Sequence, residues 1–109
     1  MTQHLQSMRA PRAQINTPCM LRRRTGSPIP AHTVELGPEG MRVSSPRPLS
    51  ADEAVDFDIP GLEMRVGGHA RVLRQQRLNV YVLRFERLPE PMVRCLHALA
   101  INSPAPPLD

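Results

Sequence analysis

Apolar and polar residues alternate with a period of two along much of this chain. In the clearest stretch, Val55, Phe57 and Ile59 alternate with Asp56 and Asp58. A strand that buries one face and wets the other produces this pattern, because successive side chains of a strand point to opposite faces. We therefore expect a strand here, with its apolar face in the core.

Shorter alternating stretches predict further strands, separated by polar, glycine or proline turns. In the first, Ile15, Cys19 and Leu21 are the candidates for the inward face. The expected strands cover residues 13–21, 31–36, 41–45, 55–59, 62–66, 70–73 and 80–85. Polar turns are expected at 22–28 and 75–77, and the pair Gly67-Gly68 predicts a bend or bulge.

The pattern changes after Pro91. Met92, Leu96 and Leu99 recur at helical spacing, and proline is tolerated in a first helical turn. Six or seven strands followed by one helix predict a mainly β fold, in which a small antiparallel sheet closes into a barrel and a C-terminal α-helix packs on it.

The length of 109 residues suits a single domain with one core. We expect this domain to span residues 9–101. Residues 1–8 show no sustained period and are expected to form a flexible tail, and the proline-rich residues 102–109 are expected to be disordered.

The formal charge is +4 and every basic residue is arginine. Arginine suits bidentate recognition of phosphate or carboxylate, but an all-arginine content is also typical of a GC-rich genome, so charge alone identifies no partner. The cysteines show no disulfide or metal spacing, and no apolar run is long enough to span a bilayer. A reduced, cytoplasmic protein that does not span a membrane is the expectation.

Three other functional classes are not supported by the sequence. The four histidines are scattered, so no metal site is predicted, and no recognised arrangement of nucleophile and base indicates an enzyme. The three aromatic residues are too few for the stacking platforms that bind single-stranded DNA or RNA. We expect no catalytic residue, cofactor or nucleic-acid partner.

Several motifs occur in an order that resembles PilZ domains. They are an arginine-bearing start at Arg9 and Arg12, the turn ELGPEG ahead of MRV, the strand VDFDI, the stretches GHARVLR and YVLRFERL, and the helix after Pro91. The resemblance covers residues 9–101 and implies a six-stranded barrel. It also implies a role in bacterial signalling, where such domains commonly bind cyclic di-GMP.

The ligand motifs of the family match less well. Receptors carry R-x-x-x-R near the start and Asp/Asn-x-Ser-x-x-Gly in a turn. Here Met8 stands four residues before Arg12, and the turn reads Glu35-Leu36-Gly37-Pro38-Glu39-Gly40, so only the last glycine matches. If cyclic di-GMP binds, the resemblance places it on Arg9, Arg12, Glu35, Gly37 and Gly40.

Two hypotheses follow. The missing hydroxyl at Gly37 and the longer acid at Glu35 favour an adaptor that acts through a protein partner in motility, pilus or polarity control, with weak or absent cyclic di-GMP binding. The alternative is a genuine receptor with a divergent site. Arg22, Arg23 and Arg24 form a possible anion or partner patch, or simply a solvated turn, and Arg74 and Arg84 match family arginines or are solvent-facing partners of acidic residues.

Overall fold

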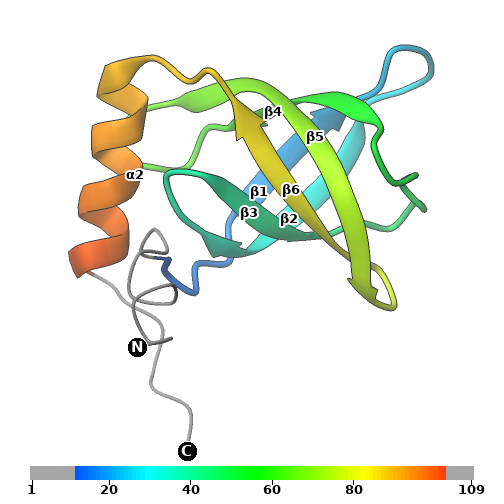
Figure 1. The fold of residues 1–109 in the computed structure, drawn as a ribbon, viewed down its shortest axis with the longest axis horizontal. Helices are drawn as coiled ribbons and strands as arrows, with labels where there is room; N and C mark the ends of the chain where they lie inside the picture. Colours follow the sequence, from blue (N-terminus) through cyan, green and yellow to red (C-terminus); the bar gives the residue numbers. More distant parts are fainter. Residues whose placement is uncertain (1–11, 103–109) are drawn as a thin grey trace, which may run out of the picture.

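The computed structural model describes residues 12–102 and contains six strands and one helix in that range (Figure 1). The strands are β1 (Pro18–Arg22), β2 (Ile29–Leu36), β3 (Gly40–Ser44), β4 (Ala54–Ile59), β5 (Val66–Arg77) and β6 (Val80–Glu86), and the helix is α2 (Glu90–Asn102). The expected tail 1–8 and Arg9 lie outside the described residues. Of the expected tail 102–109, Asn102 is instead the last residue of α2, and residues 103–109 lie outside the described residues.

The six strands close into an antiparallel barrel in the order β1-β2-β3-β6-β5-β4. The last strand, β6, inserts between β3 and β5, and β1 closes the barrel against β4. The predicted mainly β barrel with a C-terminal helix is confirmed, with six strands in the described part of the chain.

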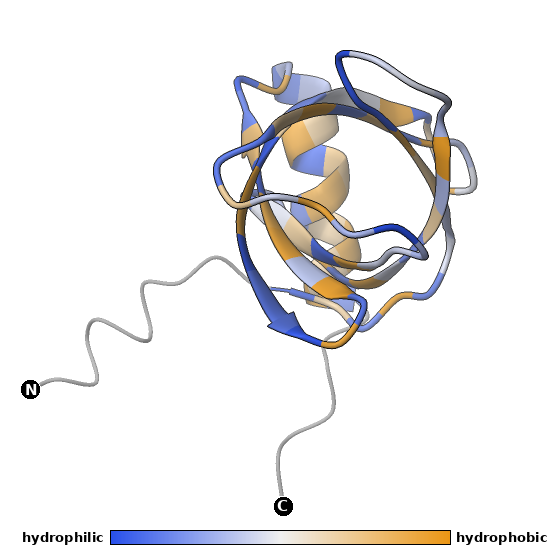
Figure 2. Cartoon of the chain, turned by 90° about the vertical axis from the view of Figure 1, so that its right-hand side faces the viewer, coloured by the Kyte–Doolittle hydropathy of each residue, from blue (hydrophilic) through white to orange (hydrophobic). Residues whose placement is uncertain are grey.

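The core lies inside the barrel, where the period-two pattern places it. Val55, Phe57 and Ile59 are all buried, as expected from their alternation with the aspartates. The rings of Phe57 and Phe85 stack with their centroids 4.6 Å apart. Figure 2, which looks along the barrel, shows hydrophobic and hydrophilic positions alternating along its strands.

The helix α2 covers one end of the barrel (Figures 1 and 2). Pro91 occupies its first turn, where the missing N–H costs no helical hydrogen bond. Leu96 and Ala100 are buried on one face, and Met92 and Leu99 pack partly buried beside the core. No helix in residues 12–102 is both long and apolar enough to cross a membrane.

Two expected boundaries are wrong. Residues 62–65 form a turn region and not the start of a strand, since β5 begins at Val66. Residues 75–77 belong to β5 and not to a turn, because their backbone continues to pair with β6 through two register shifts. The chain reverses instead at Leu78 and Asn79, where Asn79 takes the left-handed conformation with φ 64°.

Two expected strand details also differ. Gly67 and Gly68 pair in regular register with Asp58 and Phe57, so this pairing contains no bulge. The register shifts of β5 fall later, along its pairing with β6. Ile15 lies before β1 and is only half-buried, so it is not a core residue.

Candidate functional site

The segment that carries Arg12 is fixed to the start of the barrel's β2–β3 hairpin. Ala13 and Leu36 exchange two backbone hydrogen bonds of 2.8 Å and form an isolated antiparallel bridge. Ala13 is fully buried. The chain from Arg12 onward is therefore held on the barrel.

A buried threonine supplies the second attachment. The hydroxyl of Thr33 accepts a hydrogen bond of 3.0 Å from the Thr17 backbone N–H and donates to the carbonyl oxygen of Ile15. Thr33 has no exposed surface. Its hydroxyl thus satisfies backbone groups that burial would otherwise leave unpaired, a situation that costs about 1–3 kcal/mol.

Glu35 lies between two arginines. Its Oε1 atom is 3.1 Å from Nη1 of Arg12 and 3.3 Å from Nη1 of Arg42, and its side chain is only 11% exposed. A register shift between Thr33 and Glu35 on β2 places this side chain on the outer face, opposite Arg42 of β3. The carboxylate therefore neutralises charge at the point where the family resemblance places a ligand arginine.

These two contacts bring opposite charges together without aligned hydrogen bonds. Within residues 12–102, neither Oε1 of Glu35 nor Nε of Arg42 has a hydrogen-bond partner, although both atoms are buried. Burial of an unpaired donor or acceptor is costly. The cluster is thus held by charge attraction more than by directional bonds.

The turn from Gly37 to Gly40 is closed by its own backbone. The N–H of Gly37 donates to the carbonyl of Gly40 at 3.0 Å, and the carbonyl of Glu39 accepts a bond of 2.9 Å from the N–H of Phe85. A Cβ atom at position 40 would overlap the carbonyl oxygen of Leu83 on β6. The fold alone therefore requires a glycine here, so the one residue that matches the family's turn motif says nothing specific about a ligand.

The segment at Arg12 and the turn from Gly37 to Gly40 border a groove of about 290 Å³ on the outer face of β3, β6 and β5. Its lining residues are Arg12, Glu35, Gly37, Glu39, Gly40, Met41, Arg42, Leu73, Arg74, Val82, Leu83 and Arg84. The structure thus gathers four of the five candidate ligand residues, and the fifth, Arg9, lies outside the described residues.

Arg42 is the site residue that the sequence analysis missed. Its outward position follows from the alternation of residues 41–45, but its contact with Glu35 depends on the register between β2 and β3. Arg74 and Arg84 also line the groove, and within the described residues neither forms an ion pair. The arginines of the groove that have no acidic partner among the described residues therefore lie on β5 and β6.

The patch of three arginines is separate from this groove. Arg22 ends β1 and Arg24 is exposed in the loop before β2, whereas the Gly37 turn follows the other end of β2. β2 has eight residues, about 26 Å of strand. Arg23 is bound by Glu53 through Nε and Nη2 at 2.6 and 2.8 Å. The patch does not contribute to the groove.

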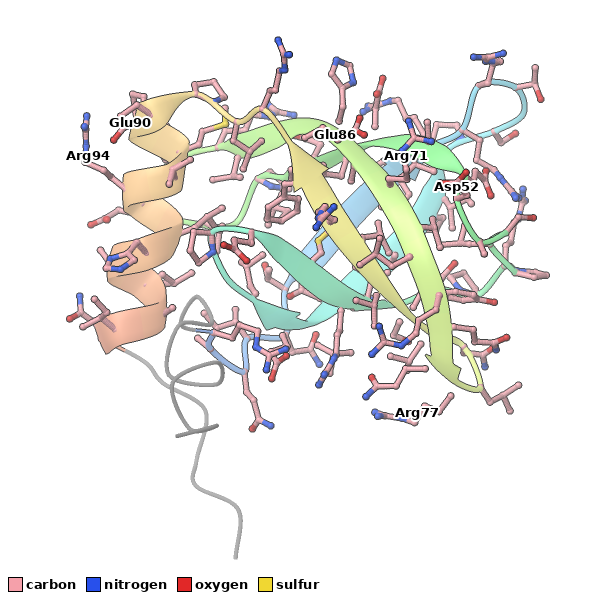
Figure 3. All side chains as sticks on the ribbon, in the orientation of Figure 1. Asp52, Arg71, Arg77, Glu86, Glu90 and Arg94 are labelled. Atoms are coloured by element: carbon pink, nitrogen blue, oxygen red, sulfur yellow. The ribbon has the colours of Figure 1, made fainter. Side chains whose placement is uncertain are left out.

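Most other surface charges near β5 are matched. Arg71 lies between Glu86 and Asp52 (Figure 3). Its Nε atom is 3.1 Å from Oε2 of Glu86, and its Nη1 atom is 3.7 Å from Oδ1 of Asp52. Arg65 donates two hydrogen bonds to Asp58, and they lower the pKa of that carboxyl below its ordinary value. Such exposed pairs contribute little stability, and they leave neither Arg65 nor Arg71 without an acidic partner.

Comparison with known proteins agrees with this fold. No curated protein sequence matches the chain. The structure of the Bacillus subtilis inhibitor of motility (MotI/DgrA) is similar, with a TM-score of 0.71 and 14% sequence identity, over 84% of this chain and 48% of that one. The chain thus spans about half the length of that protein. The sequence model of the PilZ domain matches residues 6–102, and the chain therefore belongs to the PilZ domain family.

Proposed function

We propose that this PilZ domain is a signalling adaptor that acts by binding a protein partner and that takes up cyclic di-GMP weakly or not at all. The observation that carries the proposal is the position of Glu35, whose carboxylate contacts both Arg12 and Arg42. A phosphate that binds either guanidinium would have to compete with that carboxylate for it.

The electrostatics of the pair explain why binding would be weak. Cyclic di-GMP is a dianion, so a receptor must offer it guanidinium groups that are free to form bidentate hydrogen bonds. Here Arg12 would have to give up a carboxylate that is largely buried. A charged hydrogen bond is worth about 1.5–3 kcal/mol, and each 1.4 kcal/mol changes affinity about tenfold.

The turn removes a further contact. Gly37 has no hydroxyl at the position where family receptors have serine, and Gly40 is required by the approach of β3 to β6. The match at the turn therefore supports the barrel more than it supports a nucleotide site. Together with Glu35, these differences favour a module that no longer depends on the nucleotide.

We propose that the adaptor acts in motility, pilus or polarity control. The fold resembles that of a motility inhibitor, and the groove beside Arg12 offers a surface on which a partner could dock. The alternative function, a receptor with a divergent site, is favoured by one observation. Arg74 and Arg84 remain without ion pairs at the groove and could meet a phosphate.

Isothermal titration of cyclic di-GMP tests the ligand half of the proposal. We expect a dissociation constant weaker than about 100 µM for the natural sequence. The triple variant Met8→Arg, Glu35→Asp, Gly37→Ser should bind at least about tenfold more tightly, because it restores the family's motif. Glu63→Asp, the same shortening at an exposed position outside the groove, is the matched control and should bind like the natural sequence.

The outcomes separate the hypotheses. Micromolar or tighter binding by the natural sequence would make the chain a receptor. A triple variant that folds and does not bind would show that the ligand positions are assigned to the wrong residues. For the adaptor half, a photo-cross-linker at position 82 should trap a defined protein in cells while one at position 63 should not, and equal trapping from both positions would contradict a partner at the groove.

A further inference from the structure

The strand β5 extends beyond its neighbour in the barrel. β5 has 12 residues and β4 has 6, and their register ends at the pair of Ala54 and Arg71. Val72 then exchanges backbone hydrogen bonds with Asp52 and Glu53. Beyond this point, no described segment pairs with residues 73–77 on the side of β4, and these residues pair only with β6 (Figure 1).

The other side of the same hairpin is covered. β6 pairs with β3 from Gly40 to Ser44, and the N–H of Ser45 continues the contact with the carbonyl of Asn79. The free edge therefore belongs to β5 alone. A strand edge with unpaired N–H and C=O groups is a template for another strand, and partner proteins use such edges for binding by strand addition.

The side chains around this edge are apolar and basic. Residues 12–102 contain three exposed large hydrophobic side chains, and two of them, Leu73 and Leu78, lie in this hairpin with 43% and 81% of their surface exposed. Arg74 and Arg77 flank them, and neither forms an ion pair with a described residue. Arg77 lies at the far end of the strand, away from the matched pair of Arg71 and Glu86 (Figure 3).

The charge of this edge selects between two kinds of occupant. A second copy of the chain would bring Arg74 and Arg77 close to their own counterparts, and like charges across a strand pair are destabilising. An acidic strand would instead pair with both arginines, and its alternate side chains could cover the exposed leucines. The same arginines protect the edge from self-association, which is how natural proteins keep a free edge soluble.

We propose that residues 73–77 accept an extended, acidic segment of a partner protein as an additional strand beside β5. The proposal rests on the proposed adaptor function, for which it names the docking surface and the chemistry of the partner. Arg74 also lines the groove on the outer face, so the added strand lies along the border of that groove. Main-chain bonds supply the pairing, and Arg74 and Arg77 select acidic sequences.

The test uses a synthetic peptide of alternating glutamate and valine, titrated into the ¹⁵N-labelled full chain and followed by NMR. We expect amide shift changes, and slowed amide exchange, confined to β5 residues 73–77 and the turn at Leu78 and Asn79. The same peptide with alternate backbone nitrogens methylated keeps its charge but cannot pair as a strand. It should bind at least about tenfold more weakly.

Variants locate the surface. Arg74→Glu with Arg77→Glu should weaken binding of the glutamate–valine peptide at least about tenfold. Arg22→Glu with Arg24→Glu makes the same change of net charge in the β1–β2 loop and should leave the affinity unchanged. All four side chains are exposed, and the dispersion of each variant's spectrum verifies that the barrel is folded.

Three results would overturn strand addition at β5. They are equal binding of the methylated peptide, shift changes centred elsewhere, and no shift changes at peptide concentrations up to about 1 mM. The titration with cyclic di-GMP is independent of them. Tight nucleotide binding together with peptide pairing at β5 would contradict the proposed nucleotide-independent adaptor and support the strand-addition site. Weak nucleotide binding without peptide pairing would support that adaptor and contradict the strand-addition site.

Discussion

Arg23 and Glu53 join two loops of the barrel through a two-point contact. Nε and Nη2 of Arg23 donate to the two carboxylate oxygens of Glu53 at 2.6 and 2.8 Å, and the N–H of Ser50 donates to the same carboxylate at 3.0 Å. The side chain of Glu53 is 18% exposed. This contact ties the loop after β1 to the segment that leads into β4.

Because of this contact, we expect part of the free energy of unfolding to be lost in acid. The hydrogen bond from Arg23 is the main cause that lowers the pKa of Glu53 below its ordinary value of 4.5. A carboxyl with a lowered folded-state pKa stabilises the fold above its unfolded-state pKa, and this stabilisation is lost as pH falls through the folded-state value. Glu53→Gln should therefore lower the free energy of unfolding at pH 7 by about 1 kcal/mol and flatten its decline below pH 4.5.

Urea unfolding over a series of pH values measures both effects. Glu90→Gln is the control, because Glu90 is 72% exposed and its pair with Arg94 spans a single helical turn at 3.5 Å (Figure 3). That variant should change the free energy of unfolding by less than about 0.5 kcal/mol. Parallel pH curves for the natural sequence and Glu53→Gln would show that the contact does not stabilise the fold.

Replacement of the motif glycine should destabilise the barrel even without any ligand. In Gly40→Ala the new methyl group overlaps the backbone carbonyl of Leu83, which cannot move without disturbing the pairing of β3 with β6. We expect a loss of about 1–3 kcal/mol in thermal or urea unfolding. Glu39→Ala, one residue earlier and exposed, should cost less than about 0.5 kcal/mol. If both variants were equally stable, the glycine would have to be explained by a ligand.

The two cysteines should differ in reactivity. Cys19 is 2% exposed, and this burial raises the pKa of its thiol to about 12. A hydrogen bond with the Asp58 backbone opposes the increase. Cys95 is half-buried on α2. Since the thiolate is the reactive form, the variant Cys95→Ser should react slowly with a disulfide reagent at pH 8 until it is unfolded, whereas Cys19→Ser should react in the native state. Rapid labelling of native Cys95→Ser would contradict the burial of Cys19.

The sequence predicted those elements whose side chains reveal which face is buried. The alternation around Phe57 and the helical spacing around Leu96 both led to the observed core. The sequence-based prediction was wrong at residues 75–77. These polar residues remain in a strand because their backbone pairs with β6 regardless of side-chain polarity. Polarity predicts exposure, and an overhanging strand is exposed on both faces.

The candidate site was predicted less completely for a similar reason. Arg12, Glu35 and Gly40 could be identified by their order in the chain, but their arrangement depends on register. The shift between Thr33 and Glu35 buries a polar threonine and sets Glu35 against Arg42, and no local pattern encodes a shift between two strands. The free edge at residues 73–77 likewise follows from the unequal lengths of β4 and β5.

The strand order also affects how the protein is made. Because β6 lies between β3 and β5, the barrel cannot close until residues 80–86 have left the ribosome. Until then, β3 and β5 each lack the partner on the edge that β6 will cover, and the backbone groups of these edges can pair with other chains. Synthesis of the C-terminal quarter of the domain is therefore the step that converts an aggregation-prone sheet into a closed barrel.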